Sequence, residues 1–181
     1  MEHIFTATYR EESEYKLSDL EPFEAELLRR VIKICFEARA AGNHPFGCLL
    51  ADSEGNVLME QGNEEVTLGG DCTAHAEALL MRKASQAYSK EMMAELTLYS
   101  CAEPCAMCSG AMYWGNLGRL MYIARESELK KATGDDIRNP TLDLPCRAVF
   151  SRGQKQIDVL GPFLELEPEF FKAHENYWAH S

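Results

Sequence analysis

Two cysteines stand at a spacing that a metal ion can use, in the segment Pro104-Cys105-Ala-Met-Cys108. Residues three apart lie on the same side of a helix, and proline is favoured where a helix begins. Both sulfurs can therefore face one ion from the first helical turn, where free N–H groups and a partial positive charge favour the thiolate form. Two small core residues are the plain alternative, which this spacing makes less favourable. The fold must then bring further ligands to the same place.

His75 is the best candidate for a third ligand. It lies in Thr73-Ala-His75-Ala-Glu77, near the start of a predicted helix. One imidazole with two thiolates suits zinc and leaves a fourth position for water. Because residues two apart on a helix point in nearly opposite directions, His75 and Glu77 converge only over the N-terminal end of their helix. We therefore expect two helices, beginning near His75 and Cys105, to point their N-termini at one ion.

Glu77 has no ligand role in this arrangement. A divalent ion and two thiolates sum to zero charge, so a carboxylate beside them is free to move protons. A solvated helix glutamate is the ordinary interpretation of a lone Glu. Next to His75 and a zinc ion with an open position, Glu77 becomes a candidate general acid and base.

The hydrophobic pattern predicts a single α/β domain over residues 1–181, with its core at roughly 20–160. We expect a three-layer α/β/α sandwich around a mixed sheet of about five strands, with an antiparallel hairpin beside parallel strands. The expected helices cover residues 22–41, 74–89, 105–114 and 166–178, and the expected strands cover residues 46–52, 57–62, 96–101 and 120–124, with further strands near Val149 and Ile157 and a polar loop over residues 135–145.

Charge and cysteine content limit the class of protein. Eighteen Lys and Arg stand against twenty-nine Asp and Glu, a formal net charge of −11, which makes a nucleic-acid partner unfavourable. Seven cysteines are an odd number spread along the chain, which favours reduced thiols and a metal site over a disulfide framework. No apolar stretch is long enough for a membrane span or a signal peptide, so we expect a cytoplasmic protein.

The motifs resemble those of the cytidine-deaminase-like superfamily of zinc-dependent deaminases. Three blocks occur in the family's order: Pro45-Phe46-Gly47, Asp71-Cys-Thr-Ala-His-Ala-Glu77 and Glu103-Pro-Cys-Ala-Met-Cys108. Within this superfamily the chain looks most like bacterial guanine deaminases, in Ala111-Met-Tyr-Trp114 and Gly134-Asp-Asp136. The resemblance implies hydrolytic deamination of a free amino-purine base, guanine or a close analogue. It also implies one Zn²⁺ per subunit and a homodimer, in which C-terminal tails can be exchanged.

The same resemblance implies roles for residues around a substrate. Phe46 would stack on a purine and Asn63 would hydrogen-bond its edge, with Ala76 beside them. Trp114 would wall the pocket and Asp136 would accept from the base. Tyr177, in the tail helix 166–178, would close the site.

The chain departs from the family pattern at several places that border the predicted pocket. Cys72 stands where many relatives have proline, and Leu68-Gly69-Gly70 alters the approach to the helix. Cys101 stands where Ser or Thr is expected, and Asn43-His44 replaces glycines before Pro45. These differences bear on the identity of the substrate more than on the type of reaction.

Several alternatives stay open. Within the superfamily these are a nucleoside deaminase acting on guanosine, adenosine or cytidine, and a tRNA adenosine deaminase, whose RNA substrate would call for a basic surface. Cys101, Cys105 and Cys108 also match the cluster spacing of radical S-adenosylmethionine enzymes, which leaves His75 and Glu77 unexplained. Finally, Cys101 or Cys72 could complete a four-ligand structural zinc site without catalysis.

Overall fold

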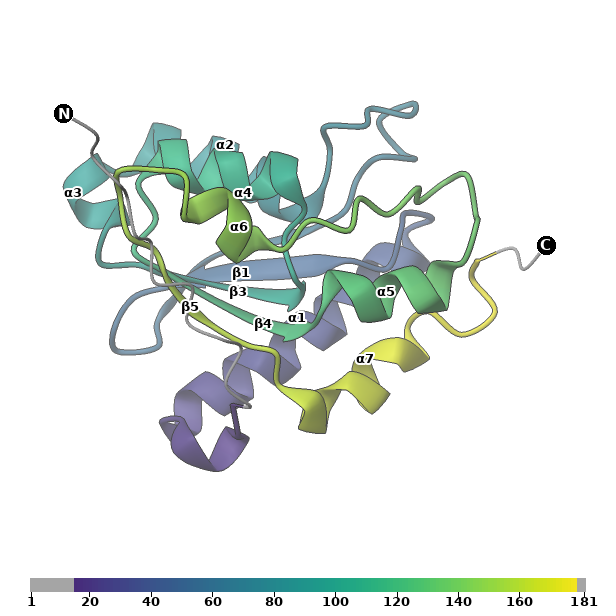
Figure 1. Cartoon of the computed structure of the whole chain (residues 1–181), viewed down its shortest axis with the longest axis horizontal. Helices are drawn as coiled ribbons and strands as arrows, with labels where there is room; N and C mark the ends of the chain where they lie inside the picture. Colours follow the sequence, from purple (N-terminus) through teal and green to yellow (C-terminus); the bar gives the residue numbers. More distant parts are fainter. Residues whose placement is uncertain (1–14, 179–181) are drawn as a thin grey trace, which may run out of the picture.

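The computed structural model describes residues 15–178, which form helices packed on both faces of one sheet (Figure 1). The sheet has five strands in the order β2-β1-β3-β4-β5. The strands are β1 (Gly47–Ala51), β2 (Val57–Gly62), β3 (Thr97–Ala102), β4 (Arg119–Ala124) and β5 (Asp158–Leu160). β1 pairs antiparallel with β2 and with β3, whereas β3, β4 and β5 run parallel. The predicted mixed sheet is confirmed.

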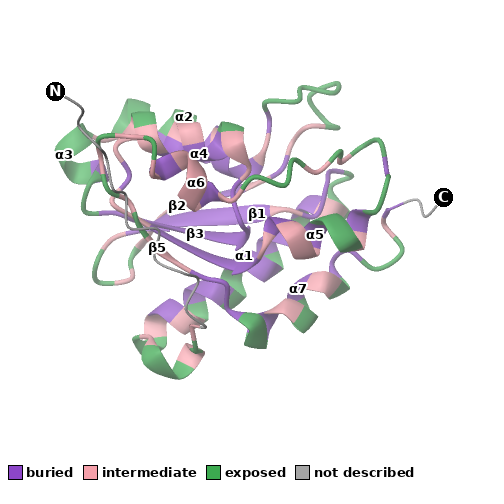
Figure 2. Cartoon of the chain, in the orientation of Figure 1, coloured by how far each residue is buried: buried purple, intermediate pink, exposed green. Residues whose placement is uncertain are grey.

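Two separate cores lie on the two faces of the sheet. One face is covered by α1 (Pro22–Ala40), α5 (Glu126–Thr133) and α7 (Glu167–Lys172), and the other by α2 (Ala76–Ala87), α3 (Lys90–Met93), α4 (Ala106–Gly115) and α6 (Cys146–Phe150). Leu49 and Leu50, adjacent in β1, enter opposite cores, as the alternation of side chains along a strand requires. The central strands β1, β3 and β4 are buried on both faces (Figure 2), which confirms the three-layer sandwich.

Local chemistry accounts for the bounds of α1. Pro22 takes the first helical position, where its missing N–H is not needed. The N–H of Glu21 donates to the carboxylate of Glu24 at 3.1 Å, one half of a capping box. The helix ends before Gly42, whose φ of +92° suits a residue without a Cβ. The helix predicted over residues 22–41 is therefore confirmed to within one residue at its end.

Glu103 joins the ends of the two central parallel strands. It follows β3, and its buried carboxylate accepts from the N–H of Glu126 at 3.2 Å and from the N–H of Cys146 at 2.9 Å. The carboxylate thus satisfies free N–H groups at the starts of both α5 and α6. The turns that follow β3 and β4 are held together, and these turns border the candidate site.

The strand predicted near Val149 is wrong, because residues 146–150 form α6. Pro145 precedes this helix, Glu103 caps its first N–H, and Cys146 and Phe150 both enter the core from one side of the helix. A short apolar run fits either a buried strand or a helix, so the spacing of apolar residues could not distinguish the two for this segment. The strand predicted near Ile157 is confirmed as β5. The pattern did not predict α3 and α5, nor the 3₁₀ turns η1 (Leu17–Asp19) and η2 (Leu164–Leu166).

The tail helix predicted over residues 166–178 is wrong in its second half. α7 ends at Lys172, and the chain continues in turns in which Asn176 has a φ of +55°. The indole N–H of Trp178 donates to Nδ1 of His174 at 3.0 Å, and the His174 ring packs edge-on against Phe46 at 5.2 Å between centroids. These aromatic contacts, rather than helix periodicity, set the path of the tail.

None of the helices between residues 15 and 178 is both long enough and apolar enough to pass through a membrane.

Candidate active site

His75 and Cys105 each occupy the cap position that immediately precedes a helix. His75 precedes α2 with φ −63° and ψ 147°, and Cys105 precedes α4 with φ −61° and ψ 171°. Neither residue is itself helical, which removes the angular conflict between His75 and Glu77. The two helix N-termini meet as predicted, because Nδ1 of His75 lies 3.7 Å from the sulfur of Cys105 and 3.8 Å from the sulfur of Cys108.

The three donors have the spacing that a zinc ion requires. Tetrahedral zinc, with Zn–S near 2.3 Å and Zn–N near 2.0 Å, places sulfur and nitrogen about 3.5 Å apart. The observed separations of 3.7 and 3.8 Å are close to this value, and the three ligand atoms lie within 4.8 Å of one another. One imidazole and two thiols are also the donor types that zinc prefers, so these residues fit the ion.

The charges in this group suit a metal. Hydrogen bonds from the Cys108 thiol and from His75 lower the pKa of Cys105 to about 4. The bond to Cys105 in turn raises the pKa of His75 to about 9. The bond to Cys105 and burial raise the pKa of Cys108. The group therefore already holds one thiolate, the form in which cysteine binds zinc.

Glu77 lies in the first turn of α2, buried beside these donors. Its Oε1 accepts a 2.6 Å hydrogen bond from the hydroxyl of Ser100 in β3, and its Oε2 accepts from the Cys108 thiol at 3.7 Å. Burial raises the pKa of Glu77, and the Ser100 bond opposes that rise. A carboxyl group tuned upward in this way is suited to exchange protons near neutral pH.

The alternatives based on further cysteine ligands are not supported. Within residues 15–178, His75, Cys105 and Cys108 make up the group of donors placed to hold a metal. Cys101 faces the core, where its sulfur accepts the N–H of Gly47 at 3.2 Å, and Cys72 is exposed. A site with four protein ligands and a cluster site of three cysteines would each need one of these two residues.

The structure places the predicted base-contacting residues in different surroundings. Asn63 is buried, and its Oδ1 accepts the N–H of Glu65 at 3.0 Å. Ala76 is the first residue of α2 and is fully buried. Phe46 is half-buried against the rings of His174 and Trp178. The base-contacting roles of Asn63, Ala76 and Phe46 stay predictions.

The roles of Asp136, Tyr177 and Trp114 also stay predictions. Asp136 is buried and accepts from the guanidinium and the backbone N–H of Arg138, both at 2.9 Å. Tyr177 is half-buried, with its hydroxyl 2.9 Å from Nδ1 of His44. Trp114 lies in α4 with 74% of its surface exposed, and its role as a pocket wall stays a prediction.

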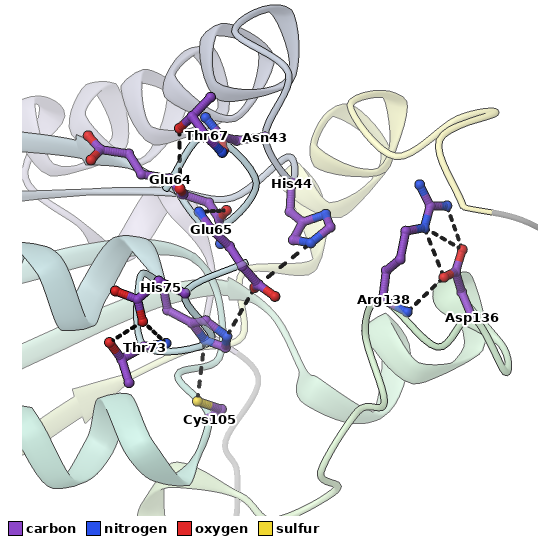
Figure 3. A network of polar contacts seen from close by, with 12 residues as sticks. Asn43, His44, Glu64, Glu65, Thr67, Thr73, His75, Cys105, Asp136 and Arg138 are labelled. Carbon is purple, nitrogen blue, oxygen red and sulfur yellow. Dashed lines mark hydrogen bonds and ion pairs between the residues drawn. The ribbon is translucent and has the colours of Figure 1, made fainter. Parts of the chain in front are cut away.

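The structure adds polar residues that the motif search missed. Figure 3 shows the carboxylate of Glu65 between the rings of His44 and His75. Ser100 holds Glu77, and Glu103 holds the turns after β3 and β4. Alternation could not have identified Ser100, because every residue of β3 is buried. Glu65 lies in a loop whose sequence carries no ligand spacing.

Comparisons with known proteins agree with this site. The family model for the cytidine and deoxycytidylate deaminase zinc-binding region matches residues 22–124. The chain is 34% identical over 164 residues to a probable cytosine deaminase of Schizosaccharomyces pombe, covering 90% of this chain and 98% of the relative. It is also 34% identical over 113 residues to a guanine deaminase of Bacillus subtilis, covering 62% of this chain and 71% of the relative.

A solved structure has the same fold. It is a mutant of the protein NE0047 in complex with 8-azaguanine, with a TM-score of 0.67, 25% identity, and coverage of 86% of this chain and 85% of that one. The match to the family model spans more than half of the chain, and the yeast relative is matched over nearly its full length. With a His-Cys-Cys donor group beside a buried glutamate and these matches to known proteins, the chain belongs to the cytidine and deoxycytidylate deaminase family and is a hydrolytic deaminase.

Proposed function

We propose that this deaminase acts on a free amino-purine base, guanine or a close analogue, with zinc bound by His75, Cys105 and Cys108. The observation that carries the proposal is the convergence of these three donors beside the buried carboxyl of Glu77. Guanine would be converted with one water to xanthine and ammonia.

Zinc in this position supplies a Lewis acid that lowers the pKa of a water molecule toward neutrality. Glu77 then has one task at each stage. It takes one proton from the attacking water and gives it to the ring nitrogen, and it then moves the second proton of that water to the exocyclic amine. The amine leaves as neutral ammonia, and burial raises the pKa of Glu77, which favours its action as a proton donor.

Charge supports a small substrate. The chain carries a net charge of −11, and Glu65 stands within 4.0 Å of His75. A polynucleotide would bring its phosphates toward a chain of net negative charge, which is unfavourable. A tRNA substrate is therefore disfavoured. A free base carries no phosphate, and the guanine deaminase relative and the 8-azaguanine complex support a purine.

We also propose the base-contacting roles that the resemblance to guanine deaminases implies. Phe46 stacks on the ring, with Asn63 and Ala76 along its edge. Asp136 accepts from its donor groups, and Tyr177 covers it. Asp136 must then share its carboxylate between Arg138 and the base.

A homodimer is the proposed assembly. Trp114 and Met107 expose 74% and 39% of their surfaces on α4, where a second subunit could cover them and bring Trp114 beside a pocket. Tyr177 reaches His44 of its own chain, so closure of the site does not need exchanged tails.

All seven cysteines are free, which supports a reducing, cytoplasmic location.

Cytosine is the second candidate substrate. The observation that favours it is the match to the probable cytosine deaminase over 98% of that protein's length. Nucleosides form a third class, in which a ribose must fit beneath the tail that carries Tyr177.

Release of ammonia from the zinc-loaded chain distinguishes these substrates. Guanine, adenine, cytosine, guanosine, adenosine and cytidine would be compared by kcat/KM, with zinc-loaded Glu77→Gln as the control for contaminating activity. We expect guanine or a related amino-purine to be the best substrate. Preference for cytosine would replace the purine proposal and leave the deaminase assignment intact.

A further inference from the structure

We infer that Glu65 is a positioning residue that holds the imidazole of His75 toward the metal and links it, through His44, to the C-terminal tail. The inference rests on the proposed zinc site, because it concerns the side of His75 that faces away from the metal. Three features carry it: the position of the carboxylate, the loop that holds it, and the contacts of His44.

The carboxylate of Glu65 stands behind the ring of His75. Its Oε2 lies 4.0 Å from Nε2 of His75, while Nδ1 of the same ring faces the two cysteine sulfurs. Histidines that bind metals usually donate their other N–H to a carboxylate or carbonyl, which fixes the tautomer and the direction of the ring. Glu65 is the group placed to accept from Nε2–H.

The separation of 4.0 Å between Oε2 of Glu65 and Nε2 of His75 exceeds a direct hydrogen bond by about 1 Å. A glutamate side chain closes such a gap by rotation about its own torsions, which have several staggered minima. The backbone of Glu65 does not need to move. It must, however, be held, because a mobile loop would not orient a ligand.

The loop between Asn63 and Ala74 is held at several points. The N–H of Glu65 donates to Oδ1 of Asn63 at 3.0 Å, and the carbonyl of Glu65 accepts from Gly70 at 2.9 Å. Gly70 has a φ of +88°, a conformation that favours glycine, so the chain can reverse its direction at Gly69-Gly70. The N–H of Glu64 then closes the loop onto the carbonyl of Ala74 at 3.1 Å, next to His75.

The same carboxylate oxygen lies near the second histidine. Oε2 of Glu65 is 3.8 Å from Nε2 of His44 (Figure 3), and Nδ1 of His44 is 2.9 Å from the hydroxyl of Tyr177. The His44 ring also stacks on Trp178, with 5.4 Å between centroids. Asn43, one residue earlier, accepts from the N–H of Thr67 and so fixes His44 beside the loop.

One oxygen therefore serves both a metal ligand and a residue on which the tail rests. Movement of the tail away from His44 would free that imidazole and change how the carboxylate of Glu65 is shared. The departures at Asn43-His44 and Leu68-Gly69-Gly70 then have one explanation. They build the carboxylate support of His75 and connect it to Tyr177.

Zinc affinity tests the inference. Zinc-loaded full-length protein would be titrated with a chelator of known affinity, and Glu65→Ala should raise the zinc Kd about 10- to 100-fold. Glu65→Gln, which keeps an acceptor of the same size, should fall between Glu65→Ala and the parent. Glu64→Ala is the matched control, because the Glu64 carboxylate accepts from Gln61 at 2.9 Å, and it should stay within about twofold of the parent.

A second readout concerns the ring itself. The Nε2–H proton of His75 should give a slowly exchanging, downfield NMR signal in the zinc-loaded parent and in Glu64→Ala, and this signal should be lost in Glu65→Ala. Unchanged zinc Kd and an unchanged signal in Glu65→Ala would overturn the inference. So would a Glu65→Gln protein that binds zinc no better than Glu65→Ala.

The link to the tail has its own test. Tyr177→Phe should weaken zinc binding less than Glu65→Ala does, and it should have no further effect in the Glu65→Ala background. If Tyr177→Phe and Glu65→Ala had additive effects on the zinc Kd, the link to the tail would be overturned. Failure of the proposed zinc site would look different, because the parent itself would then not bind one zinc ion per chain.

Discussion

The hydroxyl of Ser100 donates a 2.6 Å hydrogen bond to Oε1 of Glu77, across the boundary between the sheet and α2. Ser100 is fully buried in β3, a strand with neighbours on both sides. A donor on such a rigid element fixes the orientation of the carboxyl group and leaves Oε2 facing the metal donors. The proposed acid/base group is thereby oriented by the sheet, while the proposed metal ligands come from the starts of two helices.

Glu77→Gln should retain zinc and the fold but lose turnover. The amide has the same size and can still accept from Ser100, yet it cannot exchange protons with water or amine. Loss of a general acid and base typically lowers rates by about 10²- to 10⁴-fold. Steady-state kcat with measured zinc content decides this, and near-normal kcat in a zinc-loaded variant would end the proposed mechanism.

Ser100→Ala should lower kcat while zinc content stays at that of the parent. A hydrogen bond to a charged group contributes about 1.5–3 kcal/mol, so a loss of roughly 10- to 100-fold is expected if the bond serves the reacting carboxylate. Ser100→Thr keeps the hydroxyl and provides the control. Equal kcat in the parent and Ser100→Ala would show that packing alone orients Glu77.

His75→Ala and Cys108→Ser should each reduce bound zinc well below one ion per chain. Removal of one of three protein ligands leaves too few donors for a stable site. Elemental analysis of purified protein measures the result, and Cys101→Ser, which changes a thiol outside the donor group, should retain zinc. Iron with labile sulfide in the parent protein would contradict the zinc assignment.

Asp136→Asn tests the proposed recognition of the base. The amide must turn a donor toward the donor edge of a guanine-like base, and the buried mismatch should lower kcat/KM about 10- to 100-fold. Arg138→Met removes the partner of Asp136 but keeps the carboxylate, so it separates the ion pair from base recognition. Zinc content should be unchanged in both. Full activity of Asp136→Asn on the best substrate would exclude Asp136 from base recognition.

The buried His174 predicts a pH dependence of stability. Burial lowers its pKa to about 3, whereas in the unfolded chain the pKa is about 6.5. Below pH 6.5 the unfolded chain takes up a proton that the folded chain does not. This histidine therefore favours unfolding by up to about 1.4 kcal/mol for each pH unit below 6.5, and its contribution is constant above that pH.

Urea unfolding of the parent and of His174→Phe at pH 7.5, 6.5 and 5.5 measures this effect. The difference in unfolding free energy between the two proteins should change in favour of the variant as the pH falls from 6.5 to 5.5. A constant difference over this range would show that His174 does not remain neutral in the folded chain.

The proposed metal donors and the proposed acid/base residue could be predicted from the sequence, because each pair of them lies only two or three residues apart. Cys105 and Cys108 lie in one helical turn, and His75 and Glu77 can share one ion only over a helix end. This constraint predicted two converging helix N-termini, and the structure confirms them. The periodicity of α1 and the two apolar runs that flank the turn formers of the hairpin were equally local signals, and both elements were found where they were expected.

Long-range contacts decided what the sequence could not. The helix α6 replaced a predicted strand because Glu103, 43 positions earlier in the chain, accepts the N–H of Cys146. The tail left its helix because His174 and Trp178 pack against Phe46, and no local pattern encodes that contact. Glu65 reaches His75 through the fold of its loop, and Ser100 reaches Glu77 through the packing of the sheet against α2. The short spacings of the chain were enough to predict the proposed reacting groups, because helix geometry relates residues only a few positions apart. The side chains that hold these groups could be found only in the folded chain, because their contacts join residues far apart in the sequence.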